Sequence, residues 1–421
     1  MLYGLLGEKL GHSFSKDIHQ RIADYQYNLI EVSKKDFSSF MQEKNFKAIN
    51  VTIPYKEMVI PYVDYIDEKA KEINAINTIV NKDGKLYAYN TDYLGLKALI
   101  VNNKIEIENK KVLVLGTGGT SKTASVVLKD LKAREVLFVS RNKKEDNEIK
   151  VVTYEEAMNL HFDADVIVNT TPSGMYPNVD SMLVELDCFN NLSAVVDVVY
   201  NPLKTKIVQK ALTKGIKAVT GLYMLVAQAV YASAIFQDKE IDESLIDVVY
   251  RGLLLKKENI VLIGMPSCGK SSIGKLLADQ LGKEFVDSDE EIEKKIGMKI
   301  KDFLTIDNEE EFRNIETEVI KELSLKNNLV ISTGGGVIKK EINVEYLKYN
   351  GKVVFIDRPL ELLQATSSRP LSSSKEALAK LYQERYPIYN KSADVVVKND
   401  VAIEEVLNLI IDYLRGKIWR Y

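Results

Sequence analysis

Apolar residues follow two alternating patterns along this chain. Short runs of consecutive apolar residues are typical of buried strands, and longer segments with apolar residues at helical spacing are typical of amphipathic helices. The segment 111–220 contains four strand-like runs: Lys111–Leu115, Glu135–Val139, Ala164–Asn169 and Ala194–Val199. Strands that alternate with helices predict an α/β fold, and in this segment a parallel, doubly wound sheet.

Residues 1 to about 100 also alternate in this way. Leu2–Gly7 and Ala48–Ile53 are predicted strands, and Lys16–Gln26 and Asp36–Glu43 are predicted helices. Small polar residues cluster in the motifs GHSFS at 11–15, NVTIPYK at 50–56 and YNTD at 89–92. Because ligands of open α/β sheets bind beyond the strand ends, we expect these clusters to share a crevice. Each cluster alone is also typical of a capped turn.

From residue 259 the pattern starts again. The apolar run Ile260–Ile263 leads into a glycine-rich turn and then into a segment with apolar residues at helical spacing. Further predicted strands are Glu284–Val286, Leu329–Ser332 and Lys352–Asp357, and predicted helices cover 308–325 and the triplet Glu384–Tyr386. This region therefore predicts a second α/β domain.

The turn at 264–271 reads GMPSCGKS and matches the P-loop pattern completely. Backbone N–H groups of such a turn bind phosphate oxygens, the lysine reaches the outer phosphates and the serine hydroxyl ligates Mg²⁺. The helix that follows points its positive end at the same anion. The predicted positions for ATP are Gly264, Ser267, Gly269, Lys270 and Ser271. The alternative is a glycine turn without a nucleotide, but the flanking strand and helix favour the P-loop.

A second glycine-rich turn follows the strand Lys111–Leu115, with Gly116, Gly118 and Gly119. The third glycine of the dinucleotide motif is replaced by Ser121, so the motif alone is weak. An NAD site usually has an acidic residue at the end of the next strand. This chain has Ser140, Arg141, Asn142, Lys143 and Lys144 there, and cationic side chains favour the 2′-phosphate of NADP. The alternative is a solvated basic loop.

Composition and charge exclude several classes of protein. A net charge of −3 gives no reason to expect nucleic acid or an anionic membrane as a partner. Two cysteines make no disulfide framework, and the early charged residues Glu8 and Lys9 do not fit a signal peptide, so we expect a cytoplasmic protein. The uncharged stretch Ala218–Gln237 is about long enough to span a membrane. A buried core helix is the favoured interpretation because a helix that is apolar on all sides is usually buried.

The first half of the chain, about residues 1–250, resembles shikimate dehydrogenase. The blocks GHSFS, NVTIPYK, INTI, NTD, LGTGGTSKTA, NTTPSGM and DVVYNPLKT occur in the family order, followed by GLYMLVAQ at 221–228. The resemblance implies reduction of 3-dehydroshikimate with NADPH. Lys56 and Asp92 would be the catalytic pair, since Lys56 can protonate the developing alkoxide and Asp92 can orient it.

The same resemblance assigns the binding residues. Ser13 and Ser15 would hold the substrate carboxylate. Its hydroxyls would contact Thr52, Asn77 and Asp92, while Tyr200 and Gln228 would close the pocket. The cofactor set is Gly116, Gly118, Gly119, Ser140, Arg141, Lys143 and Gly221.

The second half, about residues 259–421, resembles shikimate kinase. GMPSCGKSS, VDSDEEIE, FRNIE, STGGGV, RPL and ERYPIYN occur in the family order. By this resemblance Lys270 serves ATP, Ser271 and Asp287 lie at Mg²⁺, and Asp289 is the candidate base that contacts the hydroxyls of shikimate. Arg313 and Arg385 would bind the carboxylate of shikimate, as arginine does bidentately.

Glycines and a lid complete the kinase resemblance. Gly334, Gly335 and Gly336 would let the backbone approach the substrate ring, and Gly335 is a predicted substrate contact. Arg369, in the lid Thr366–Ser374, would stabilise the transferring phosphoryl group. An arginine that usually precedes RPL in the family is absent here.

The combined expectation is a bifunctional enzyme that makes shikimate and then shikimate 3-phosphate. Its fold class would be α/β, with a substrate domain at 1–100 plus a helix at about 222–250, a Rossmann-type NADP domain at 101–221, a linker at 251–258 and a P-loop domain with a parallel sheet at 259–421. The alternative is a quinate or shikimate dehydrogenase fused to a kinase module with weak or regulatory activity. The sequence leaves the oligomeric state open.

Overall fold

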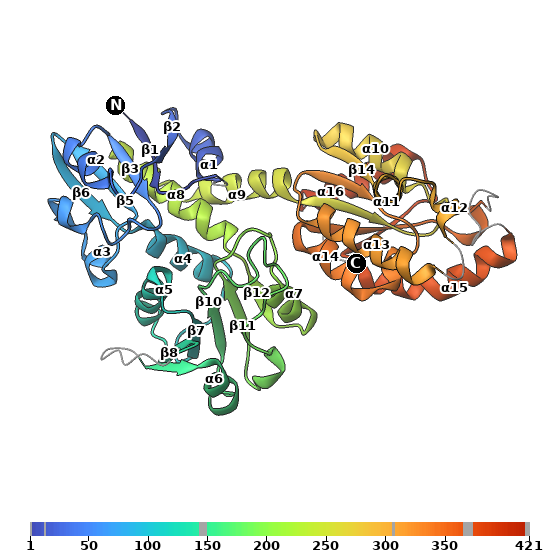
Figure 1. Ribbon diagram of the computed structural model, residues 1–421, viewed down its shortest axis with the longest axis horizontal. Coiled ribbons are helices and arrows are strands. Elements are labelled where there is room, and N and C mark those ends of the chain that lie inside the picture. The colour runs from blue at the N-terminus through green and yellow to red at the C-terminus, as the bar shows by residue number, and fades with distance from the viewer. Residues whose placement is uncertain (1, 12–13, 143–149, 305–307, 365–373, 417–421) are drawn as a thin grey trace. The chain divides into compact units, whose positions relative to one another are not determined.

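The computed structural model describes residues 2–11, 14–142, 150–304, 308–364 and 374–416. The chain divides into two compact units, Met1–Leu253 and Leu254–Tyr421. Each unit is built on sheets that contain parallel strands, with helices packed on them (Figure 1). The predicted α/β fold class is therefore confirmed.

The first sheet of the N-terminal unit has the strand order β2-β1-β3-β5-β6-β4. Strands β1 and β3 run parallel, whereas β5 pairs antiparallel with β3. Its strands are β1 Tyr3–Gly7, β2 Tyr27–Glu31, β3 Ala48–Val51, β4 Tyr65–Ile66, β5 Thr78–Lys82 and β6 Lys85–Tyr89, with helices α1 Ser15–Ile22, α2 Phe37–Glu43 and α3 Glu68–Ile73. The buried side chains of Leu6, Ile49 and Ile79 form part of its core.

The second sheet has the order β12-β11-β10-β7-β8-β9, and its pairs are parallel throughout. Its strands are β7 Lys111–Leu115, β8 Glu135–Ser140, β9 Val151–Thr153, β10 Val166–Asn169, β11 Ala194–Asp197 and β12 Lys217–Val219. Its helices are α5 Gly119–Asp130, α6 Tyr154–Leu160 and α7 Lys206–Thr213. The reversal of strand order on the two sides of β7 is typical of a doubly wound sheet, whose ligands bind at this switch point.

Helices α4 (Thr91–Asn102) and α8 (Leu222–Gln237) pack against each other between these two sheets (Figure 1). Most side chains of α8 are buried, which agrees with a core helix. Among the described residues, no helix has the length and apolar character needed to cross a membrane.

The C-terminal unit has a parallel sheet with the order β14-β15-β13-β16-β17. The strands are β13 Asn259–Ile263, β14 Glu284–Asp287, β15 Leu329–Ser332, β16 Gly351–Asp357 and β17 Val395–Lys398. The helices are α10 Lys270–Leu281, α11 Ser288–Ile296, α12 Ile300–Phe303, α13 Glu309–Ser324, α14 Glu341–Asn350, α15 Lys375–Ser392 and α16 Ile403–Leu414.

Short 3₁₀ turns occur in both units. They lie at Ile60–Tyr62 and Leu186–Cys188 in the N-terminal unit and at Val337–Lys339 and Leu360–Leu362 in the C-terminal unit.

The region 222–258 differs from the expected single helix and linker. Helix α8 ends at Gln237 because Asp238 adopts a left-handed conformation with φ 53° and its N–H bonds back to the last turn. A second helix, α9 (Ser244–Lys257), follows, and the Asp242 carboxylate accepts from the N–H and hydroxyl groups of Ser244 at its start. The expected linker at 251–258 is therefore mostly helical. The first predicted helix is also shorter, since it ends at Ile22 instead of Gln26.

His19 lies fully buried in an aromatic cluster of the N-terminal unit. Its ring stacks on Tyr27 at 3.8 Å between centroids, and its Nδ1 lies 2.7 Å from the hydroxyl of Tyr25. Burial lowers the pKa of His19 to about 3, because a charged imidazole loses its hydration there. Folding therefore selects the neutral ring.

We predict an acid-dependent loss of stability from this histidine. The unfolded chain takes up a proton near pH 6.5, whereas folded His19 does so only near pH 3. Stability therefore falls as the pH drops below 6.5, by up to about 1.4 kcal/mol per pH unit from this group. Urea unfolding of the N-terminal unit in the full chain, monitored by limited proteolysis between roughly pH 4.5 and 6.5, should show a shallower pH slope of the unfolding free energy for His19→Phe. An identical slope in both proteins would contradict this account.

Candidate active sites

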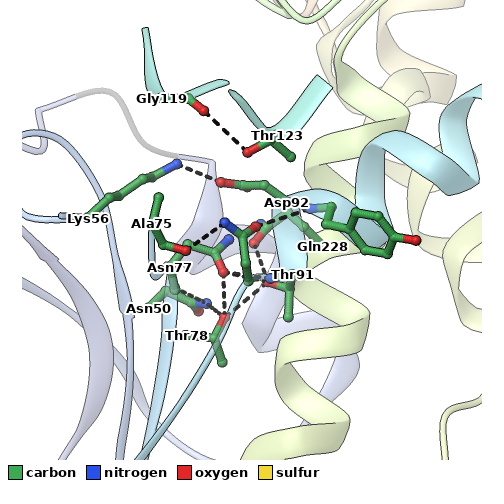
Figure 2. A network of polar contacts seen from close by, with 12 residues as sticks. Asn50, Lys56, Ala75, Asn77, Thr78, Thr91, Asp92, Gly119, Thr123 and Gln228 are labelled. Carbon is green, nitrogen blue, oxygen red and sulfur yellow. Dashed lines mark hydrogen bonds and ion pairs between the residues drawn. The ribbon is translucent and has the colours of Figure 1, made fainter. Parts of the chain in front are cut away.

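Lys56 and Asp92 form an ion pair in a cavity of about 210 Å³ in the N-terminal unit. The Nζ of Lys56 donates to Oδ2 of Asp92 at 2.6 Å, and both side chains keep partial exposure (Figure 2). Lys56 follows strand β3, while Asp92 lies in the first turn of α4. The two predicted catalytic residues therefore lie together in the crevice that the polar clusters predicted.

Figure 2 shows a network of amides and hydroxyls beside this pair, in which Asn50 and Asn77 also line the cavity. Oδ1 of Asn77 accepts from the backbone N–H of Thr91 at 2.7 Å and from the hydroxyl of Thr78 at 3.0 Å. Asn50 donates to the hydroxyl of Thr78 at 3.1 Å. Asn90 caps α4 by accepting from the N–H of Tyr93. Because α4 begins in this network, Asp92 is fixed opposite Lys56.

The structure brings most of the predicted substrate residues to this one cavity. Those that line it are Ser15, Thr52, Asn77, Asp92, Tyr200 and Gln228, together with the predicted catalytic residue Lys56 and the predicted cofactor residue Gly221. Ser13 lies outside the described residues. Asn50, Thr91 and Thr120 had no predicted role, although the first two stand within the polar clusters at 50–56 and 89–92.

The glycine turn after β7 is open above the start of α5. Gly116 has φ 106°, and in the described structure no atom lies within 4 Å of a Cβ built on Gly118 or Gly119. Ser121 replaces the usual third glycine, and its buried hydroxyl lies 2.7 Å from that of Thr170. This contact gives the serine a partner, so the weak motif still forms an open turn at a helix N-terminus, which suits a phosphate.

The other residues predicted to bind the cofactor differ in their exposure. Arg141 is exposed after β8, Ser140 is half-buried, and Lys143 lies outside the described residues. Gly221 packs so closely on the loop after β11 that an added Cβ would meet the carbonyl oxygen of Val198 at 1.9 Å. Close packing on Val198 is therefore one reason why this position holds glycine.

The P-loop of the C-terminal unit has the expected backbone. Gly264 and Gly269 have φ 149° and 95°, which only glycine adopts without strain. Lys270 is buried, and its Nζ donates to the carbonyl oxygens of Gly264 at 2.9 Å and Met265 at 3.0 Å. The hydroxyl of Ser271 donates to Oδ2 of Asp287 at 2.9 Å. A hydroxyl beside a carboxylate provides the oxygen ligands that Mg²⁺ prefers.

Arg313 and Arg385 are buried side chains on the wall of a cavity of about 640 Å³ that also contains the P-loop. Nη1 of Arg385 donates to the carbonyl oxygen of Gly335 at 2.9 Å. In the described part of the chain, the Nε atoms of both arginines have no hydrogen-bond partner. Buried donors without partners are costly, so an anionic ligand would stabilise them.

Glu316 is a buried carboxylate at the end of the block FRNIE, to which the sequence alone gave no role. Nη1 of Arg313 donates to its Oε2 at 2.8 Å from one helical turn away on α13. Burial raises the pKa of Glu316, and the guanidinium of Arg313 opposes this shift. The sequence shows that Glu316 follows Arg313 by three residues, a spacing at which two side chains of a helix can pair. It does not show that Glu316 is buried.

The glycines at 334–336 lie against the charged groups of the cavity. A Cβ on Gly334 would meet a carboxylate oxygen of Asp289 at 2.4 Å, and one on Gly336 would meet the guanidinium of Arg313 at 2.6 Å. Asp289, Asp287 and Ser271 line the same cavity. Arg369 lies outside the described residues. The P-loop, the acidic pair and the arginines therefore share one site.

Two family models match this chain. The model described as "Shikimate dehydrogenase substrate binding domain" matches residues 5–79, and the model described as "Shikimate kinase" matches residues 266–415. A shikimate dehydrogenase (NADP(+)) of Clostridium perfringens is 41% identical over 267 residues, which cover 60% of this chain and 98% of that protein. A shikimate kinase of Clostridium botulinum is 48% identical over 158 residues, which cover 37% of this chain and 95% of that protein.

The chain belongs to both families. Its first unit is a shikimate dehydrogenase unit and its second is a shikimate kinase unit, so the chain is a bifunctional enzyme of the shikimate pathway. A solved chorismate mutase/shikimate 5-dehydrogenase fusion protein from Clostridium acetobutylicum is 39% identical, with a TM-score of 0.56. It covers 60% of this chain, and the match spans 96% of that chain.

We predict that Glu316→Ala weakens shikimate binding by the kinase unit. Loss of the carboxylate frees Arg313 to leave its position, and a charged hydrogen bond contributes about 1.5–3 kcal/mol. The KM for shikimate should rise roughly tenfold or more, with a smaller change in kcat. The matched control is Glu318→Ala on the same helix, because Glu318 is exposed and pairs with Lys295. Equal KM values in the two variants would refute the role of Glu316.

Proposed function

We propose that this chain reduces 3-dehydroshikimate to shikimate with NADPH and then phosphorylates shikimate with ATP and Mg²⁺ to shikimate 3-phosphate. The observation that carries the proposal is the composition of the two cavities. In the cavity of the N-terminal unit, Lys56 pairs with Asp92. The cavity of the C-terminal unit is lined by Lys270, Asp289, Arg313 and Arg385. Both cavities offer groups that suit a small hydroxylated carboxylate. We place the enzyme in the cytoplasm.

The dehydrogenase cavity has the groups that ketone reduction needs. NADPH would supply the hydride, and its phosphates would lie at the open turn of Gly116, Gly118 and Gly119. Lys56 would donate a proton to the oxygen that gains negative charge, and its cation would stabilise that oxygen beforehand. Asp92 holds the ammonium group at 2.6 Å. Ser15, Thr52, Asn77, Tyr200 and Gln228 would position the ring.

The kinase cavity is organised for phosphoryl transfer. Positioning and charge neutralisation dominate this reaction. Mg²⁺ would be held by Ser271 and Asp287, and would neutralise charge on the phosphates of ATP. Lys270 would leave the carbonyl oxygens that it now contacts in order to reach the outer phosphates. Asp289 would accept the proton of the attacking hydroxyl, while Arg313 and Arg385 hold the carboxylate. Arg369 completes the proposed catalytic set.

We predict that the two reactions can be removed separately. Lys56→Ala should lower dehydrogenase kcat by at least about 100-fold, because general acid catalysis is lost, and should leave kinase activity unchanged. Lys270→Ala should have the reverse effect. Separate assays of NADPH oxidation and ADP formation measure both outcomes on one preparation.

The controls are Lys82→Ala and Lys275→Ala. Lys82 pairs with Asp238 on the surface, and Lys275 is exposed on α10. If one active-site substitution silenced both activities in a folded chain, the proposal of independent sites would be wrong. If Lys270→Ala changed no rate, the kinase unit would have the weak or regulatory role of the alternative hypothesis.

A further inference from the structure

Asp197 is a fully buried carboxylate at the end of β11 that the proposed reactions do not use. Its Oδ1 accepts from Nδ2 of Asn169 at 3.0 Å and from the N–H of Val199 at 3.0 Å. Its Oδ2 accepts from the hydroxyl of Thr205. Burying a carboxylate costs free energy, and well-packed apolar residues often stabilise a protein as well as buried charges do. A contribution to stability alone therefore does not explain why a carboxylate with three hydrogen-bond donors is buried at position 197.

One side of this network leads to the nucleotide turn. Oδ1 of Asn169 accepts from the N–H of Thr171 at 3.1 Å and from its hydroxyl at 2.7 Å. The adjacent Thr170 bonds to the carbonyl oxygen of Leu115. A Cβ on Gly116 would lie 2.9 Å from the side chain of Thr171. The loop after β10, residues 170–175, therefore supports the turn at which NADPH is expected.

The other side leads to the substrate cavity. Asp197 holds the N–H of Val199, and the neighbouring residues Val198 and Tyr200 both line the cavity. Thr205 stands at the start of α7, where a hydroxyl commonly caps the helix, yet its hydroxyl donates to Asp197 instead. The Asp197 carboxylate therefore accepts hydrogen bonds from both ends of the loop after β11, residues 198–205.

We propose that Asp197 is a positioning residue for the dehydrogenase reaction, which fixes the nucleotide-side loop 170–175 and the substrate-side loop 198–205 relative to each other. The inference rests on the proposed dehydrogenase function. It places the coupling between the two binding sites in the hydrogen bond from Asn169 to Asp197, which joins the ends of the neighbouring strands β10 and β11. Burial also raises the pKa of Asp197 to about 6, and the three donors named above oppose that shift.

Threonine variants on the two sides separate the two loops. Thr205→Val removes a donor on the substrate side, so the KM for shikimate should rise about 3- to 10-fold with little change in the KM for NADP⁺. Thr171→Val should raise the KM for NADP⁺ by a similar factor and leave that for shikimate nearly unchanged. Asp197→Ala should raise both. Asp197→Asn should restore both to within about threefold, because the amide oxygen still accepts and the Thr205 hydroxyl can accept from the amide nitrogen.

The dissociation constant of NADPH, and that of shikimate for the dehydrogenase cavity as distinct from the kinase cavity, should show the same division on the same variants. The kinase activity of each chain measures the amount of intact chain, and the urea-unfolding transition of the N-terminal unit reports whether the dehydrogenase unit is folded. Asp187→Ala is the matched control, because Asp187 lies in the same sheet domain but is exposed and pairs with Lys210 and Lys214.

The proposal is overturned if the threonine variants change neither constant, or if Asp197→Ala lowers only the active fraction while both KM values stay unchanged. The threonine variants decide the matter if Asp197→Ala does not fold. A parent chain that binds both ligands but does not oxidise shikimate would refute the proposed function alone, since the binding constants would still test Asp197.

Discussion

Polar groups buried inside a protein need hydrogen-bond partners, and this requirement determines how both active sites are built. In the dehydrogenase unit, Asn77 and Thr91 satisfy each other, and their contact fixes the start of α4 and with it Asp92. In the kinase unit, Glu316 accepts from Nη1 of Arg313, while the Nε of that arginine has no hydrogen-bond partner among the described residues. The proposed catalytic and binding groups are therefore positioned by neighbours to which the proposal gives no reaction step.

The parallel sheets bring these neighbours together. The carboxyl ends of adjacent parallel strands lie at one edge, so residues far apart in sequence become contacts. Asn169 and Asp197 end neighbouring strands of the second sheet, and Asp287 and Ser332 end neighbouring strands of the kinase sheet. The hydroxyl of Ser332 lies 3.2 Å from that of Ser271. Topology thus supplies the proximity, and hydrogen bonding supplies the orientation.

Much of this was predictable because local patterns carry it. The P-loop spacing, the apolar runs and the polar clusters located the strands, the nucleotide turn at 264–271 and the crevice. The resemblance to shikimate dehydrogenase then singled out Lys56 and Asp92 within it. Features that depend on long-range burial were not predictable. Glu316 and Asp197 resemble other acidic residues in the sequence, and only the fold shows that they are buried. Ser121 departs from the dinucleotide motif, and only the structure shows that its hydroxyl contacts that of Thr170. The break after Gln237 depends on the conformation of one residue, Asp238, inside a region with a helical pattern.

The most direct test is one reaction vessel with 3-dehydroshikimate, NADPH, ATP and Mg²⁺, in which NADPH loss and ADP formation are followed together. Two functional active sites predict that ADP appears after a lag and that its final amount equals the NADPH consumed. Omission of NADPH should abolish ADP formation, and added shikimate should restore it. NADPH loss without ADP, or ADP formation that does not depend on shikimate, would contradict the account.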